Sequence, residues 1–236
     1  MRYVEKYTAP DYLESWKEDQ KIVTKKLFYN DFPYKEKLNE DLRREQHNIC
    51  CYCQRRINHF QGELSYGSHN EHLYPENVIG DEKSLELQLE YSNIYACCID
   101  SRGCEKKLQY CGEAKSNKII PKLIQKRDCS SYFRYNILGE IIPNGDLDKW
   151  DDYVSAKLGL NGHIKEAFDC IETLNLNCIT LKIFRYEVLQ TFISVIYKWP
   201  VEKLEEYINS YEKSRDFQEF IDMKLQYMKN RLKSIK

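Results

Sequence analysis

Three cysteines fall within four residues where positions 50–53 read CCYC. A C-x-x-C turn directs its two outer sulfurs toward one point, so Cys50 and Cys53 are the pair expected to bind a metal. Cys51, between them, is expected to be dispensable. Structural zinc needs four soft or borderline ligands, usually in two such pairs from separate parts of the chain. The sequence therefore predicts that Cys50 and Cys53 supply half of a zinc site.

The other half must come from later cysteines, and spacing alone leaves four candidates. They precede the next cysteine, at position 129, and are Cys97, Cys98, Cys104 and Cys111. Seven of the ten cysteines lie between residues 50 and 111, and such clustering favours a metal site over scattered buried thiols. A thioredoxin-like redox pair is disfavoured, because CYCQRR is not followed by the apolar helix of a βαβ unit.

Between the two cysteine groups, residues 68–78 read SHNEHLYPENV and contain adjacent Glu71 and His72. Neighbouring residues of a strand point to opposite faces unless the strand twists or ends there. At a strand end beside a cation, a carboxylate can bind the cation and an imidazole can deprotonate water. The pair by itself also fits an ordinary solvated loop.

Four short motifs follow one another in a fixed order. They are CCYCQRRI at 50–57, NEHLYPEN at 70–77, YSNIYACC at 91–98 and YCGEAKSNK at 110–118. In this order they resemble the HNH nucleases, in which a C-x-x-C pair precedes an acidic residue plus His, a middle Asn and a second cysteine pair that opens a helix. With TLNLNCITLKIFRYEVL downstream, the chain is similar to the HNH proteins that act with ATPases in bacterial anti-phage systems of the Septu and retron type.

The resemblance implies roles for single residues. Glu71 matches the acidic residue that binds the catalytic metal, and His72 matches the general base. Asn93 matches the middle Asn, which ties the loop to the strand and orients the histidine. Cys98 and Cys111 match the third and fourth zinc cysteines, so Cys97 and Cys104 become spare alternates.

One position departs from the pattern. Gly112 stands where many HNH nucleases carry the last ligand of the catalytic metal, directly after the fourth zinc cysteine. Glu113 or Asn117, on the turn that opens the expected helix, could then supply the missing oxygen, or water could.

The chemistry that the resemblance implies is hydrolysis of phosphodiester bonds in DNA, with RNA left open. Two metals have separate functions: structural Zn²⁺ bound by four thiolates, and catalytic Mg²⁺ or Mn²⁺. The implied partner is an AAA or ABC-type ATPase. The rival reading is a zinc-stabilised module that binds nucleic acid or a partner without cutting it.

Basic residues near the motifs are candidates for binding the substrate backbone. They are Arg55, Arg56, Lys115 and Lys118, with His69 as a further substrate contact. An ordinary solvated surface explains these residues equally well. Over the whole chain, 36 Lys and Arg balance 37 Asp and Glu, which argues against a protein that coats nucleic acid non-specifically.

The elements that must position this chemistry indicate an α+β protein: a zinc-stapled ββα-metal (HNH) module embedded between helical regions. Residues 1–45 form a helical region with amphipathic helices at 10–27 and 35–46, and residues 46–120 form the module. Residues 121–236 form a hairpin closed by an Asn144–Gly145 turn and a mostly helical C-terminal lobe. No signal peptide or membrane span is evident, so a soluble, cytoplasmic protein is expected.

Overall fold

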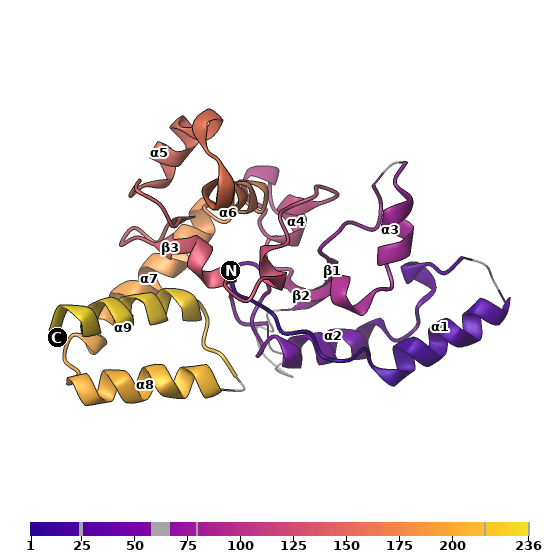
Figure 1. Ribbon diagram of the computed structural model, residues 1–236, viewed down its shortest axis with the longest axis horizontal. Helices are drawn as coiled ribbons and strands as arrows, with labels where there is room; N and C mark the ends of the chain where they lie inside the picture. The colour runs from indigo at the N-terminus through magenta and orange to yellow at the C-terminus, as the bar shows by residue number, and fades with distance from the viewer. Residues whose placement is uncertain (24–25, 58–66, 79, 215, 236) are drawn as a thin grey trace.

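The computed structural model describes residues 1–23, 26–57, 67–78, 80–214 and 216–235. The described chain is α+β and mostly helical, with two small two-stranded sheets (Figure 1). Its helices are α1 Asp11–Val23, α2 Lys35–Glu45, α3 Glu82–Leu87, α4 Gly112–Lys115, α5 Trp150–Ser155, α6 Gly162–Thr173, α7 Ile179–Ile196, α8 Val201–Lys213 and α9 Ile221–Ile235. Its strands are β1 Ser68–His72, β2 Ile94–Cys98, β3 Phe133–Tyr135 and β4 Ile141–Pro143.

Helices α1 and α2 confirm the two amphipathic helices predicted for the N-terminal region. In α2, Leu38 and Leu42 are both fully buried and, being four residues apart, share one face of the helix. That face packs on β1 and β2. The N-terminal region therefore supports the strands that carry the predicted site.

Strands β1 and β2 are antiparallel, with Glu71 opposite Tyr95, His72 opposite Ile94 and His69 opposite Cys97. All of β2 is buried, and the short helix α4 follows it. The order of elements in this part of the chain is β1, α3, β2 and α4, and the α+β class expected from the sequence is confirmed. Residues 58–66, which fall within the predicted module, lie outside the described residues.

The predicted hairpin exists, but its turn was misplaced. Strands β3 and β4 pair in antiparallel fashion, and residues 136–140 connect them, whereas Asn144–Gly145 follows β4. The Oδ1 atom of Asn136 accepts hydrogen bonds from the backbone N–H groups of Leu138 and Glu140 at 3.0 and 3.1 Å. Gly139 adopts a φ of 74°, which glycine tolerates at no steric cost. The Asn136 side chain stabilises this turn by binding the backbone N–H groups that follow it, so the hairpin turns here and not at Asn144–Gly145.

The C-terminal region is helical, as predicted. Helix α7 ends at Ile196, and Pro200 then caps α8. Helices α8 and α9 lie side by side (Figure 1) and bury a shared apolar cluster that includes Leu204 and Ile221. No helix in the described part of the chain is long and apolar enough to cross a membrane.

One large hydrophobic core joins all three predicted regions. It contains Leu13 from α1, Ile94 from β2 and Leu181 from α7. In Figure 1 the β1–β2 pair lies between the N-terminal helices and the C-terminal lobe. The strands that carry the candidate site are therefore held from both sides.

Candidate metal centre and adjoining polar site

Four cysteines from three segments meet at one point. Cys50 and Cys53 come from a turn after α2, Cys98 ends β2, and Cys111 immediately precedes α4. Their sulfurs all lie within 4.8 Å of one another, and all four residues are buried. These are the four cysteines that the resemblance selected, and they form a cluster that could hold a structural Zn²⁺.

Local backbone geometry explains why the sulfurs converge. The N–H of Cys50 donates to the Arg55 carbonyl at 2.8 Å, and the N–H of Gln54 donates to the Cys50 carbonyl at 3.1 Å, which closes the turn. Gln54 and Cys111 both have positive φ angles, of 65° and 57°, which are uncommon for residues other than glycine. The backbone thus bends sharply directly after Cys53 and at Cys111.

The sulfur separations fit a single zinc ion. Cys50 Sγ lies 3.9 Å from Cys111 Sγ, and Cys53 Sγ lies 3.7 Å from Cys98 Sγ. A tetrahedron with Zn–S bonds of about 2.3 Å has sulfur–sulfur edges of about 3.8 Å. An iron–sulfur cluster would hold its cysteines farther apart, because inorganic sulfides and several irons lie between them.

Electrostatics single out Cys50 within the cluster. Burial raises the pKa of a thiol, but hydrogen bonds from Cys111 and from its neighbours Cys51 and Cys53 outweigh that effect and hold the pKa of Cys50 well below its usual range. The N–H of Cys98 also donates to Cys50 Sγ, at 3.4 Å.

The two spare cysteines have different surroundings. Cys104 is exposed. Cys97 is buried, and its sulfur lies 3.9 Å from Cys50 Sγ. The sulfurs of Cys97, Cys50 and Cys51 form a second group, again within 4.8 Å of one another.

Glu71 is the centre of a polar cluster beside the cysteines. Its carboxylate accepts a bond from Lys115 Nζ at 2.9 Å, from the Tyr52 hydroxyl at 3.3 Å and from His69 Nε2 at 3.1 Å. Burial raises the pKa of a carboxyl, but the hydrogen bond from His69 and the charge of Lys115 outweigh this, so the pKa of Glu71 is lowered. We call these four residues the polar cluster.

His72 lies on the other face of β1. Its Nε2 donates to the Gln88 carbonyl at 2.8 Å, and its ring packs edge-on against Tyr29 with centroids 4.6 Å apart. The side chain is buried, and burial lowers the pKa of His72. Glu71 and His72 therefore do not share a face, because β1 stays extended through its last residue.

Gly112, at the start of α4, lies against the polar cluster. A Cβ atom at Gly112 would lie 2.7 Å from Glu71 Oε2 and 2.9 Å from His69 Nε2. A side chain at position 112 would thus point directly at the polar cluster. His69 Nδ1 is buried and has no hydrogen-bond partner among the described residues.

Asn93 holds the loop after β1 in place. Its Nδ2 donates to the carbonyls of Tyr74 and Leu87 at 2.9 and 3.1 Å, and its Oδ1 accepts from the Tyr74 N–H at 2.7 Å. The Leu73 N–H bonds the Asn93 carbonyl at 2.9 Å. Asn93 thereby fixes the backbone directly after His72.

Glu113 and Asn117 face away from this cluster. Glu113 accepts a bond from Arg102 Nε at 3.0 Å, and Asn117 is exposed. Both line a surface hollow together with Glu172 and Asn175. The structure does not bring either of them to Glu71, which bonds His69 instead.

The basic residues do not assemble into one groove. Arg55 is buried and pairs with Asp100 at 2.8 Å, and Lys115 is buried against Glu71. Arg56 pairs with Asp216 at 3.0 Å. Lys118 is exposed.

Sequence reasoning missed the partners of Glu71, although a signal for one of them was present. His69 and Glu71 are two residues apart, so on a strand they share a face, whereas the resemblance pairs Glu71 with the adjacent His72. The sequence predicts Lys115 at the surface, as a phosphate contact or an ordinary solvated residue. Its place at the end of α4, four residues after Cys111, turns it inward instead.

Comparison with models of known protein families gives no match, and comparison with curated proteins gives none either. The geometry of the two clusters is therefore what a functional proposal must be built on.

Proposed function

We propose that this chain is a metal-dependent nuclease of the HNH type whose active site lies where β1 meets the start of α4. The observation that carries the proposal is the approach of Glu71 Oε2 and His69 Nε2 to the position where a Gly112 side chain would begin. Carboxylate and imidazole groups are common ligands of divalent cations in hydrolytic sites. The buried cysteine cluster directly precedes α4 and would fix its start relative to β1.

In this proposal Glu71 and His69 bind the cation. Their oxygen and nitrogen are 3.1 Å apart, close to the separation of about 3 Å between neighbouring ligands of an octahedral ion. Imidazole suits Mn²⁺ better than Mg²⁺, so Mn²⁺ is the expected activator. A bound cation would stabilise the negative charge that develops on a phosphodiester during hydrolysis.

His72 keeps the role of general base in this proposal. Its Nε2–H is bonded to Gln88, so Nδ1 is the nitrogen that accepts a proton. Because the pleat of β1 directs His72 away from Glu71, this role requires the end of the strand to twist when substrate binds. Separate alanine variants of His69 and His72 distinguish binding of the cation from proton transfer.

A second candidate function is a zinc-stabilised binding module without catalysis. The observation that favours it is the ion pair between Glu71 and Lys115, whose side chains are 10% and 2% exposed. This pair, with bonds from His69 and Tyr52, satisfies the carboxylate in the absence of any cation. The two candidates differ in whether Glu71 serves chemistry or only stability.

We also propose that DNA is the substrate and an ATPase the partner, and that exposed apolar side chains form the surface that binds this partner. The apolar faces of α8 and α9 are buried against each other. Large exposed apolar residues lie instead in the β3–β4 turn and on α7, namely Ile137, Leu138, Ile183 and Tyr186. The turn lies on α7, since a Cβ atom at Gly139 would meet the backbone of that helix. Such patches commonly mark protein interfaces.

The test is a cleavage assay on the zinc-loaded full chain, alone and with an ATPase of the implied AAA or ABC type, in Mn²⁺ or Mg²⁺. Plasmid, linear duplex, single-stranded DNA and RNA are compared. The nuclease proposal expects cation-dependent cutting that Glu71→Gln abolishes and that Glu105→Gln, at an exposed surface ion pair, leaves unchanged. Binding to nucleic acid without cutting under every condition would support the second candidate and refute the first.

A further inference from the structure

Six buried cysteines gather in this molecule, two more than one zinc site uses. Besides Cys50, Cys53, Cys98 and Cys111, a second group consists of Cys50, Cys51 and Cys97, with all three sulfurs within 4.8 Å of one another. Cys50 belongs to both groups. We propose that the second group binds a second Zn²⁺ ion and that the Cys50 thiolate bridges the two ions.

Two pairs of adjacent cysteines make a shared arrangement possible. Cys97 and Cys98 are consecutive in β2, so their side chains take opposite faces of the strand. Cys98 enters the first group and Cys97 the second. Cys51 is held beside β2, because its N–H donates to the Ala96 carbonyl at 3.2 Å. Cys50 Sγ is close to sulfurs of both groups: it lies 3.9 Å from Cys111 Sγ of the first group and 3.9 Å from Cys97 Sγ of the second.

Backbone N–H groups point at the sulfurs that a second ion would use. The N–H of Gly112 donates to Cys97 Sγ at 3.4 Å, and the N–H of Cys98 donates to Cys50 Sγ at the same distance. Hydrogen bonds of this kind stabilise thiolates and orient metal ligands. Cys97 Sγ thus accepts a backbone hydrogen bond of the kind that metal-binding sulfurs accept, although Cys97 is not one of the four cysteines of the first group.

The charge balance also permits a second ion. One Zn²⁺ with four thiolates carries two net negative charges. A second Zn²⁺ that recruits the thiolates of Cys51 and Cys97 adds two positive and two negative charges. The buried net charge therefore does not change, and the desolvation cost that opposes burying extra charge is avoided.

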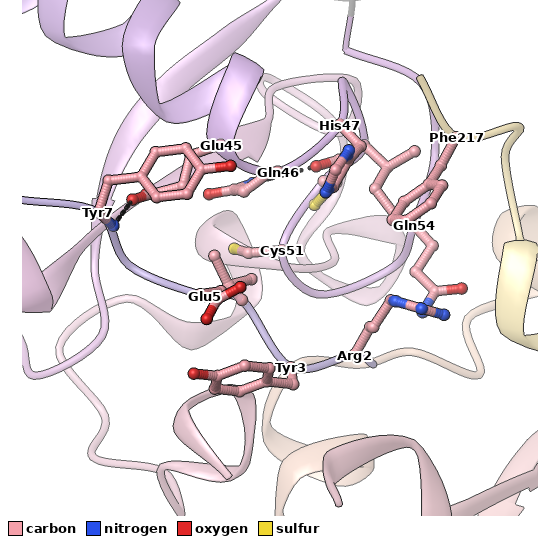
Figure 2. A pocket seen from close by; sticks show the side chains of 13 residues that line it. Arg2, Tyr3, Glu5, Tyr7, Glu45, Gln46, His47, Cys51, Gln54 and Phe217 are labelled. Carbon is pink, nitrogen blue, oxygen red and sulfur yellow. Dashed lines mark hydrogen bonds between the residues drawn. The ribbon is translucent and has the colours of Figure 1, made fainter. Parts of the chain in front are cut away.

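A cavity reaches the second group. It has a volume of about 190 Å³, and Cys50 and Cys51 form part of its wall. Figure 2 shows the Cys51 side chain among those of Glu5, Gln46 and His47. Three thiolates leave one position of a tetrahedron open, and this cavity has room for water as the fourth ligand. The second ion should therefore exchange more readily than the first, which four cysteines enclose.

The test is the zinc content of the purified full chain, measured by elemental analysis. We expect two zinc ions per chain in the parent, and one in both Cys51→Ser and Cys97→Ser. Cys104→Ser is the matched control, because Cys104 is exposed, and should keep two. One zinc in the folded parent would overturn the proposal, as would two zinc ions that persist in Cys51→Ser.

A second measurement needs no variant and so does not depend on how variants fold. The parent is loaded with ¹¹³Cd²⁺, and its cadmium NMR spectrum is recorded. A shared thiolate predicts two resonances split by coupling between the two metals through Cys50. A single resonance, or two resonances without mutual coupling, would overturn the bridge.

Discussion

The cysteine cluster and the polar cluster both adjoin the start of helix α4, yet they are built in different ways. Cys50 and five further cysteines from three segments form two groups that share Cys50, so several ligands of one chemical kind can share the binding of a metal. In the polar cluster, Lys115, Tyr52 and His69 all bond one carboxylate, that of Glu71. There each partner has a different chemistry and none can replace another.

This difference predicts different responses to substitution. In the cysteine cluster, the loss of one thiolate should cost a bound metal ion. In the polar cluster, removing Glu71 or Lys115 leaves an opposite charge buried without compensation, which is strongly destabilising. Substitutions in the two clusters should therefore give distinct patterns of stability, metal content and activity.

The largest expected effect is the loss of Cys50 and Cys53 together. Structural zinc contributes on the order of 10 kcal/mol to folding in small zinc modules, so Cys50→Ser/Cys53→Ser should lose its zinc and the ordered fold of the module. Circular dichroism, limited proteolysis and zinc analysis measure this. A variant that keeps the zinc content and protease resistance of the parent would show that the cluster is not a metal site.

The next largest effect concerns the ion pair of Glu71 and Lys115, which is buried with 2.9 Å between the charged atoms. Glu71→Gln or Lys115→Met alone should lower the free energy of unfolding by about 3–5 kcal/mol. The double variant should lose less than the sum of the two, because no unpaired charge remains. Urea denaturation of all four proteins gives the coupling, and strict additivity would contradict a direct pair.

A smaller effect is expected at Asn93, which makes three hydrogen bonds to the backbone of Tyr74 and Leu87. Asn93→Ala should cost about 2–3 kcal/mol, since buried carbonyl and N–H groups lose their partners. The zinc content should stay that of the parent, which separates this change from damage to the cysteine cluster. Urea denaturation with parallel zinc analysis measures both, and loss of zinc would contradict the assignment.

The smallest effect is expected outside both clusters, at Arg56. Its ion pair with Asp216 is partly exposed, and such pairs contribute roughly 0–1 kcal/mol. Arg56→Ala should leave stability nearly unchanged. If Arg56 also contacts phosphate, the salt dependence of DNA binding will become weaker by about one charge. Unfolding and binding titrations at several salt concentrations measure the two effects, and a large loss of stability would contradict this placement.

Much of this arrangement could be predicted from the sequence. Helices α1 and α2 followed from apolar spacing, and the four-cysteine group followed once a resemblance chose among the candidates that spacing left open. Cysteines are few and chemically distinctive, so their positions in the sequence strongly limit which residues can form the metal site. Glu71 was singled out because it lies between the two cysteine groups, whereas the sequence left open whether its segment is a strand or a loop.

The rest depended on geometry that residue types do not encode. Whether Glu71 faces His72 or His69 is decided by the extended backbone of β1 through its last residue. Lys115 and Arg55 carry charges that are typical of surface residues, but both are buried. Lys115 pairs with Glu71, and Arg55 pairs with Asp100. The β3–β4 turn was misplaced because the Asn136 side chain binds the backbone after it, an interaction that a search for Asn-Gly overlooks.

Binding of Mn²⁺ to the zinc-loaded full chain, followed by electron paramagnetic resonance, tests most directly whether Glu71 and His69 together form a cation site. One Mn²⁺ site is predicted in the parent. His69→Ala and Glu71→Gln should each weaken it by about tenfold or more, whereas His72→Ala should bind as the parent does. A parent that binds no Mn²⁺, or a His69→Ala variant with the affinity of the parent, would contradict the account.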